Sequence, residues 1–136
     1  MHELTIDQAA TDTGVSKHTL RYYEREGLLP HIDKAPSGHR RYSPGDIEWV
    51  RFLQLLRATG MPIREMKTFV ALTHAGDHTI PDRIAVLERY HAALVQRMKE
   101  DRDHLARLDR KLGIYRDIVA AQEVTPERII GEPSRT

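Results

Sequence analysis

The sequence predicts a mainly α-helical protein, with a small N-terminal domain of short helices followed by one long helix. Over residues 1–76, apolar residues recur at helical spacing in short segments that glycine and proline interrupt. From residue 82 to 121 no proline occurs and Gly113 is the only glycine, so we expect one helix through 79–121. Residues 122–136 show no periodicity and are expected to form a flexible tail.

The composition excludes several classes of function. None of the 136 residues is cysteine, which excludes disulfides, thiolate metal sites and cysteine-based redox sensing. The formal net charge is +1, so the whole chain is not a polycation. No apolar stretch approaches the roughly 20 residues of a membrane span, and the N-terminus lacks a secretory signal. We therefore expect a soluble, cytoplasmic protein.

The first two helices are short and separated by a tight turn. Thr5 and Gln8 have the spacing of a capping box, and Gly14 can end the first helix in a left-handed conformation. Ser16 can cap a second helix that Gly27 ends. Two helices joined this closely must cross at a sharp angle, which is typical of a helix-turn-helix unit.

One face of the second helix carries donors suited to nucleic acid. Lys17, Arg21 and Arg25 follow one another at intervals of four, and His18 and Tyr22 lie beside them. Such a face can bind base edges and phosphates in a major groove. A merely solvated helix face is an equally weighted explanation of the same pattern.

The segment after this helix is expected to form a β-hairpin wing. A Pro-Ser-Gly turn at 36–38 separates two short arms, one starting at His31 and the other ending at Tyr42, which would close the wing onto the core. Residues 17–41 carry six basic and three acidic residues, a local excess suited to phosphate.

Two further helices are expected to support this unit. Ser43 and Pro44 are suited to the cap and first position of a third helix, Gly60 interrupts the chain, and Pro62 begins a fourth helix. The apolar residues of both helices have the spacing of a core. They are Ile47, Trp49, Val50, Phe52, Leu53, Leu55 and Leu56 on the third helix, and Ile63, Met66, Phe69, Val70 and Thr73 on the fourth.

Several blocks, in this order and spacing, resemble the DNA-binding domain of the MerR family of transcriptional regulators. The resemblance extends over residues 4–120. The blocks are Thr5-Ile6, Gly14-Val15-Ser16, Leu20-Arg21-Tyr22-Tyr23-Glu24, Gly27-Leu28-Leu29, Gly38-His39-Arg40-Arg41-Tyr42, Asp46, Leu56-Arg57 and Thr59-Gly60-Met61.

The resemblance implies a winged helix-turn-helix domain that contacts DNA through three groups of residues. The recognition helix would contribute one group, the first wing a second, and a phosphate contact in the second wing the third. The residues implied are His18, Arg21, Tyr22 and Tyr23, with Lys17 beside them; Arg40 and Arg41, with Tyr42; and Arg57.

The long helix carries a coiled-coil seam. Positions alternating by three and four residues are almost all apolar or aromatic, a pattern that a second copy of the chain would cover. The family resemblance implies an antiparallel two-stranded coiled coil in a homodimer. The seam residues are Ile84, Leu87, His91, Leu94, Met98, Asp101, Leu105, Leu108, Leu112, Tyr115 and Val119.

Two seam positions are polar. Polar residues at core positions commonly fix the register of a coiled coil. In an antiparallel pair centred near residue 96, His91 of one chain would approach Asp101 of the other.

The sequence leaves the regulatory signal open. His74, Asp77 and His78 form a metal-like cluster, but their spacing is unspecific and a solvated turn is the stronger interpretation. Within the family the chain is similar to the branch linked to alcohol dehydrogenase and aldehyde responses, whose members carry a reactive cysteine where Leu55 stands here. Either a small-molecule effector binds between the coiled coil and a DNA-binding domain, or DNA binding is constitutive.

The leading hypothesis is a sequence-specific, dimeric transcriptional regulator that binds a pseudo-palindromic site in double-stranded promoter DNA. By resemblance it would distort the spacer DNA for RNA polymerase and need no cofactor. The alternative is a coiled-coil adaptor whose winged domain binds protein. An enzyme is disfavoured, because no activated nucleophile, phosphate-binding glycine loop or acid–base pair is visible.

Overall fold

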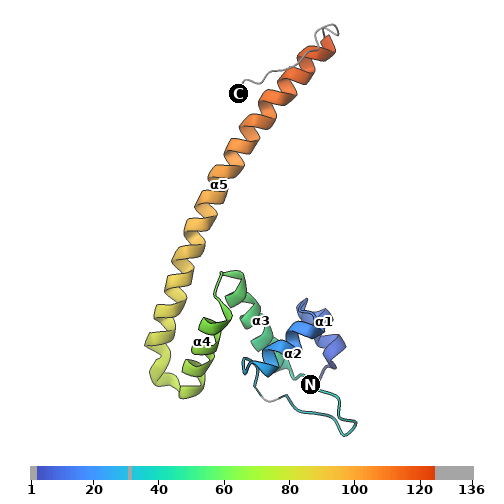
Figure 1. Cartoon of the computed structure of the whole chain (residues 1–136), viewed down its shortest axis with the longest axis vertical. Coiled ribbons are helices and arrows are strands. Elements are labelled where there is room, and N and C mark those ends of the chain that lie inside the picture. The colour runs from blue at the N-terminus through green and yellow to red at the C-terminus, as the bar shows by residue number, and fades with distance from the viewer. Residues whose placement is uncertain (1–2, 31, 125–136) are drawn as a thin grey trace. The chain divides into compact units, whose positions relative to one another are not determined.

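The computed structural model describes residues 3–30 and 32–124. His31 and residues 125–136, which include most of the expected tail, lie outside the described residues. The chain divides into two compact units between Leu94 and Val95, which are described separately. The elements are α1 (Ile6–Thr13), α2 (Lys17–Arg25), α3 (Pro44–Ala58), α4 (Ile63–Ala75), a 3₁₀ turn η1 (Asp77–Thr79) and α5 (Ile80–Val124) (Figure 1).

The predicted caps of α1 and α2 are confirmed. The Thr5 hydroxyl accepts the Gln8 N–H at 3.1 Å, and the Gln8 side chain accepts the Thr5 N–H at 2.9 Å, which completes a capping box. Gly14 ends α1 with φ at 77°, in the left-handed region that glycine adopts without steric cost. The Ser16 hydroxyl accepts the Thr19 N–H at 3.0 Å and caps α2. These bonds fix the tight turn between the two helices.

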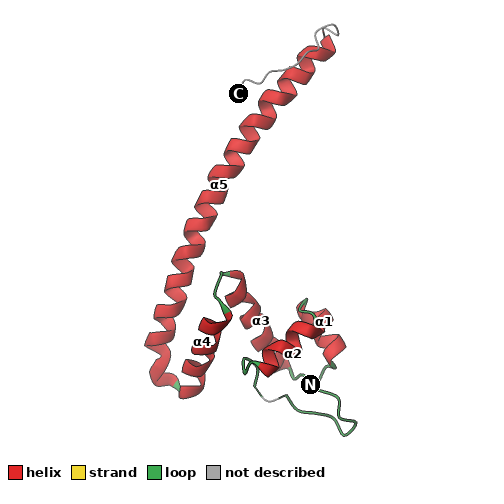
Figure 2. Ribbon diagram, in the orientation of Figure 1, coloured by secondary structure: helices red, strands yellow, loops and turns green. Residues whose placement is uncertain are grey.

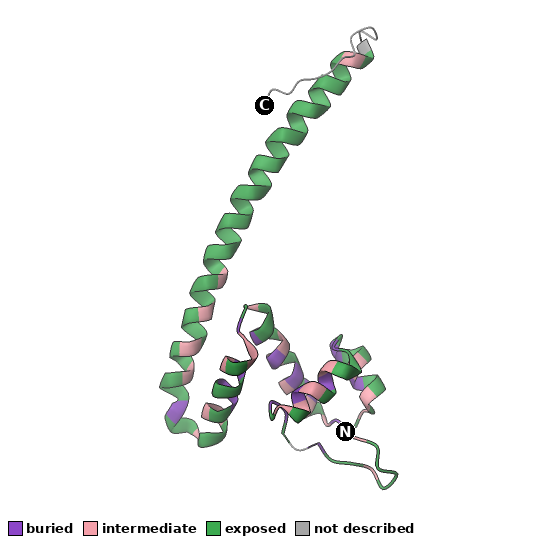
Figure 3. Cartoon of the chain, viewed as in Figure 1, coloured by how far each residue is buried: buried purple, intermediate pink, exposed green. Residues whose placement is uncertain are grey.

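The buried side chains of the first unit gather where α1 to α4 meet (Figure 3). Leu55 is an exception to the predicted core, because its side chain is 56% exposed. Its neighbour Leu56 is buried, whereas Leu55 lies at helical spacing with the exposed residues Glu48 and Arg51 on the outer side of α3. The largest fully buried side chains are Leu20, Leu28, Ile32, Tyr42, Val50, Leu53, Leu56, Met61 and Met66.

Two side chains of α3 bind main-chain carbonyls at the ends of the helix-turn-helix unit. The indole N–H of Trp49 donates to the carbonyl of Leu28 at 2.7 Å, just beyond α2. The side-chain amide of Gln54 donates to the carbonyl of Thr13 at 2.7 Å, at the last residue of α1. Each bond satisfies a carbonyl left without a helical partner, so α3 holds both short helices in place.

No strand occurs among the described residues, so the segment between α2 and α3 is drawn as loop (Figure 2). The expected β-hairpin is reduced to one isolated antiparallel bridge between Lys34 and Arg40. Pro36, which cannot donate to a ladder, follows two residues after that bridge. Tyr42 forms its own bridge with Leu4, before α1, rather than continuing the pairing of the loop.

The long helix begins one residue later than expected, because Thr79 belongs to η1 and is buried. Instead of capping α5, its hydroxyl lies 2.6 Å from the carbonyl of Leu72 and 2.8 Å from that of Gly76. Arg83 donates from Nε to this hydroxyl at 3.0 Å and from its terminal nitrogen to the Gly76 carbonyl at 2.9 Å. The first turn of α5 is thereby bound to the end of α4.

The second unit consists of the rest of α5, which stays helical through Gly113. Nearly all of its described side chains are exposed (Figure 3). None of the described helices is long and apolar enough to cross a membrane. The exposed large apolar residues of α5 as a whole are Ile80, Ile84, Leu87, Val95, Met98, Leu105, Leu108, Leu112, Ile114, Tyr115, Ile118 and Val119.

Candidate nucleic-acid interface

The exposed face of α2 carries two polar side chains without a partner. His18 and Arg21 form no hydrogen bond or ion pair with any described residue, and both are exposed. Lys17 differs, because its Nζ lies 2.8 Å from Oδ1 of Asp7 on α1. The hydrogen bond and charge of Lys17 lower the pKa of Asp7. Thus His18 and Arg21 are available to a ligand, while Lys17 also ties α2 to α1.

Farther along α2, an arginine lies over an aromatic ring. The guanidinium carbon of Arg25 is 5.6 Å from the centroid of Tyr22, a cation–π geometry. Tyr22 is half-buried against the core, with its ring centroid 6.3 Å from that of Tyr23. Tyr22 therefore presents a partly accessible ring beside Arg21.

Two tyrosines predicted to contact DNA lie in the core instead. Tyr23 is 5% exposed and Tyr42 is 0% exposed. Burial raises the pKa of both phenols. The Tyr42 hydroxyl is buried and has no hydrogen-bond partner among the described residues. Aromatic residues supply large apolar area to a core, so both rings support the surface rather than form it.

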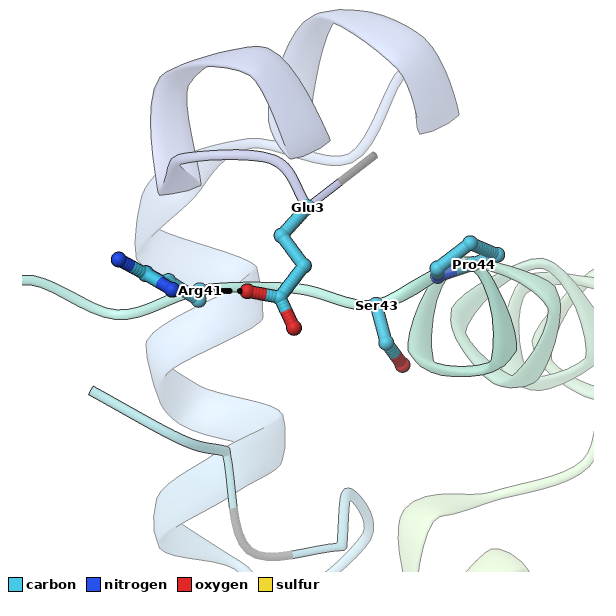
Figure 4. Close-up of a pocket in the computed structure, with 4 residues that line it drawn as sticks. All are labelled: Glu3, Arg41, Ser43 and Pro44. Carbon is cyan, nitrogen blue, oxygen red and sulfur yellow. Dashed lines mark hydrogen bonds and ion pairs between the residues drawn. The ribbon is translucent and has the colours of Figure 1, made fainter. Parts of the chain in front are cut away.

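The loop between α2 and α3 places its basic residues beside acidic partners. Arg40 Nε donates to Glu24 Oε1 on α2 at 2.6 Å. Arg41 donates to Glu3 Oε1 at 3.1 Å, beside Ser43 and Pro44 at the start of α3 (Figure 4). The guanidinium of Arg41 is half exposed and retains unpaired N–H donors.

Arg57 lies near the end of α3. One terminal nitrogen donates to the carbonyl of Met61 at 3.2 Å, which positions the exposed side chain at the turn before α4. The charge of Arg57 also acts on Tyr23, where it opposes the rise in pKa caused by burial.

The acidic partners of this surface were missed by sequence reasoning. Glu3, Asp7 and Glu24 bind Arg41, Lys17 and Arg40, respectively, from other elements. A sequence indicates side-chain pairs that lie three or four residues apart on one helix. These pairs join different segments, so no such spacing indicates them. Glu24 is already counted in residues 17–41, but Glu3 and Asp7 lie outside that range, so the sum over it overstates the free positive charge.

The metal-like cluster does not come together. No group of three or more histidine, aspartate or glutamate side chains with ligand geometry occurs among residues 3–30 and 32–124. Asp77 instead lies 4.0 Å from Arg83, at the limit of an ion pair. His74 and His78 are both exposed.

The seam residues of α5 are mostly exposed in the single chain. Leu94 is half-buried and His91 is exposed. Asp101 Oδ1 lies 3.8 Å from Nδ1 of His104 on the same helix. Asp101 therefore has a histidine neighbour within its own chain, besides the expected His91 of a second copy.

The geometry can be compared with known proteins. The family model for MerR HTH family regulatory proteins matches residues 4–72, and this range contains α1 to α3 and most of α4. An uncharacterized HTH-type transcriptional regulator of Haemophilus influenzae is 35% identical over 120 residues, covering 88% of this chain and 89% of that protein. The chain belongs to the MerR family.

Other relatives agree with this assignment. The HTH-type transcriptional regulator AdhR of Bacillus subtilis is 35% identical over 93 residues, covering 68% of this chain and 66% of that protein. The crystal structure of HiNmlR, a MerR family regulator lacking the sensor domain and bound to promoter DNA, matches with a TM-score of 0.80 at 34% identity. It covers 88% of this chain and 94% of that one.

This chain is therefore a MerR-family transcriptional regulator, as the sequence blocks predicted. A putative regulator from Listeria monocytogenes in the same family has a TM-score of 0.79 at 34% identity, covering 91% of this chain and 95% of that one. The family is regulatory rather than catalytic, and the adaptor alternative has no support among these relatives.

Proposed function

We propose that this MerR-family chain is a homodimer that binds a pseudo-palindromic promoter site and distorts its spacer to control transcription. The observation that carries the proposal is the pair of unpaired, exposed side chains His18 and Arg21 on a capped helix. A similar regulator of known structure is bound to promoter DNA. The site of action would be the cytoplasm.

In this proposal α2 is the recognition helix in the major groove. A helix-turn-helix unit places the N-terminal part of its second helix against base edges. Arg21 has the donors for a bidentate contact with guanine, and His18 lies one turn nearer the start of α2. The Nζ of Lys17 would bind phosphate in addition to its contact with Asp7.

The loop between α2 and α3 would act as the first wing. Arg40 and Arg41 carry the donors for phosphate, and Glu24 holds Arg40 against α2 through one nitrogen, which leaves the others available. Arg57 would bind phosphate from the turn before α4. Such contacts fix the register of a protein on the duplex without reading its sequence.

Dimerisation would occur through α5 as an antiparallel coiled coil. The helix has 45 residues and, at about 1.5 Å per residue, is roughly 68 Å long. Its seam leaves Met98, Leu105, Leu108 and Leu112 exposed in one chain. Burying such side chains contributes roughly 1.5–3 kcal/mol each, so a second copy is favoured. The dimer would present two α2 helices to successive half-sites.

Regulation would act through the shape of the DNA. Bending or untwisting a promoter spacer costs several kcal/mol by order of magnitude, which protein contacts repay. The distorted spacer would align the promoter elements for RNA polymerase, which is the partner we propose besides DNA. A small-molecule effector, if one binds, would act by changing the balance between undistorted and distorted spacer DNA in the complex.

The test combines oligomeric state with DNA binding. Light scattering after size exclusion should give the mass of a dimer, twice 15.7 kDa. Salt-titrated fluorescence anisotropy should then show tight binding to the duplex upstream of this chain's own gene, with a steep salt dependence and clear preference over a scrambled duplex. A monomer would contradict the coiled coil, and a dimer that binds all duplexes equally would contradict sequence-specific regulation.

A further inference from the structure

One carboxylate on α4 accepts two hydrogen bonds from α5. Oε1 of Glu65, in the first turn of α4, accepts from the Tyr90 hydroxyl at 2.6 Å and from a terminal nitrogen of Arg89 at 2.8 Å. The guanidinium of Arg89 lies 5.4 Å from the Tyr90 ring centroid. All three residues belong to the first unit, where α4 and the start of α5 run side by side (Figure 1).

The Glu65 contact is one of two polar links that the described residues make between α5 and the region of α4 and its end, besides the packing of Val86 and Tyr90 against the core. The other link lies at the far end of α4, where Arg83 binds Thr79 and Gly76. Arg83 and Tyr90 are seven residues apart, or about 10 Å along a helix. Two links separated by this distance, together with the packing of Val86 and Tyr90, restrain the angle between the helices more than a link at the turn alone would.

The same helix is also linked to the end of α2. Lys67 Nζ lies 2.5 Å from Oε1 of Glu26, the residue that follows α2. Farther along α4, Met66 and Phe69 are buried in the core. A continuous set of contacts therefore runs from the end of α2 through α4 to α5.

We propose that Glu65 is a positioning residue that sets the half-site spacing accepted by the dimer. The inference rests on the proposed function, in which α5 joins two copies and each α2 occupies one half-site. Since Glu65 restrains the angle of α4 to α5, it restrains the separation and rotation of the two α2 helices. Each base pair added to a spacer moves a half-site by about 3.4 Å and turns it by about 34°.

The experiment measures the affinity of the protein for a series of duplexes that differ in the number of base pairs between the two half-sites. The full-length protein is titrated against the operator of the proposed function and against versions with one base pair inserted or removed. We expect wild-type affinity to fall at least about tenfold on either change, because a restrained dimer matches one spacing. For Glu65→Ala we expect this difference to shrink to less than about threefold.

Two further variants separate positioning from folding. Tyr90→Phe keeps the ring and removes only the hydroxyl, so it should relax the spacing preference partway. Glu48→Ala is the matched control, because Glu48 is an exposed helical glutamate with no hydrogen bond or ion pair to any described residue. It should keep the wild-type preference, and light scattering should show a dimer for every variant.

The possible results test the role of Glu65 separately from the proposed function of the chain. If wild-type protein shows no preference for the operator, the proposed function fails. If wild-type protein prefers one spacing and Glu65→Ala keeps that preference in full, the positioning role is wrong while the function stands. A uniform loss of affinity at every spacing, in Glu65→Ala and Tyr90→Phe alike, would also overturn it, because a purely structural role predicts that result.

Discussion

Arg40 donates from Nε to Oε1 of Glu24 at 2.6 Å, and this bond joins the loop before α3 to the last turn of α2 across sixteen residues of sequence. Both side chains are partly buried. The bond therefore connects the proposed recognition helix to the proposed first wing.

Glu24→Gln should weaken both the fold and DNA binding. Replacing the carboxylate with an amide keeps an acceptor oxygen but removes its negative charge, so the charge-assisted bond becomes a weaker neutral one, for which we expect a loss of about 1 kcal/mol in the free energy of unfolding. DNA affinity should fall several-fold as Arg40 loses its fixed position. Urea denaturation and anisotropy measure the two effects. Equal stability and equal affinity in the variant would show that the negative charge of Glu24 is not needed to position Arg40.

Arg21→Ala and Arg40→Ala should differ in how they weaken binding. If Arg21 contacts a base, its loss should cost about 1–3 kcal/mol on the operator and much less on a scrambled duplex. Loss of Arg40 should weaken both duplexes by similar factors and reduce the salt dependence of binding. Anisotropy on the two duplexes at several salt concentrations makes the comparison. Identical behaviour of the two variants would contradict the assigned roles.

Trp49→Phe should destabilise the N-terminal unit. The phenyl ring can fill much of the indole's place, but it cannot donate to the Leu28 carbonyl, whose hydrogen bond of 2.7 Å would be lost. We expect a decrease of about 1–2 kcal/mol in the free energy of unfolding. Circular dichroism should follow unfolding, since Trp49 is the only tryptophan and its fluorescence is lost with the substitution. Unchanged stability would indicate that this bond is replaced by water.

The ion pair between Lys67 and Glu26 should contribute to stability over a defined range of pH. The hydrogen bond with Lys67 lowers the pKa of Glu26 below its ordinary 4.5, and the reciprocal bond raises the pKa of Lys67 above 10.5. The Glu26 carboxylate thus stabilises the fold fully at pH values above its ordinary pKa, and this stabilisation is lost as the pH falls through its lowered pKa. The Lys67 ammonium stabilises the fold fully at pH values below its ordinary pKa, and this stabilisation is lost as the pH rises through its raised pKa.

Lys67→Met should accordingly differ most from wild type between about pH 5.5 and 9.5, and the difference should narrow at about pH 3. Urea denaturation of both proteins across this range measures it. The replacement keeps much of the aliphatic stem, so a pH-independent difference would indicate lost packing rather than a lost ion pair.

Leu105→Asp should convert the dimer to a monomer. A charged side chain at a seam position would be buried without a partner in the coiled coil. Ile114→Asp is the matched control, because Ile114 is equally apolar and exposed on α5 but lies off the seam. Light scattering should report a monomer for the first variant and a dimer for the second. The opposite result would place the interface on another face of the helix.

Local signals in the sequence predicted most of the fold. Thr5, Gly14, Ser16 and Ser43 act where the caps were expected, because capping depends on residues a few positions apart. The family was also predicted, from the order of short blocks, and the relatives confirm it.

Contacts between distant segments could not be predicted in the same way. The partners of Arg40 and Glu65 lie sixteen and about twenty-five residues away, and no helical period connects them. Tyr42 was expected both to close the wing onto the core and to stand with the DNA-contacting residues of the wing, and packing places its ring fully in the core. Leu55 was assigned to the core from its apolarity, although the face of α3 that it occupies is exposed.

The bond from Gln54 to the carbonyl of Thr13 has a consequence for how the sequence can change. The acceptor is a main-chain atom, which every amino acid supplies, so substitutions at position 13 leave this bond intact if the helix persists. The donor is a specific amide, so the constraint falls on position 54. In a library of single substitutions selected for folding, position 54 should tolerate few replacements that lack a donor. This contact between α1 and α3 thus depends on the side chain at position 54 of α3 and not on the identity of the side chain at position 13.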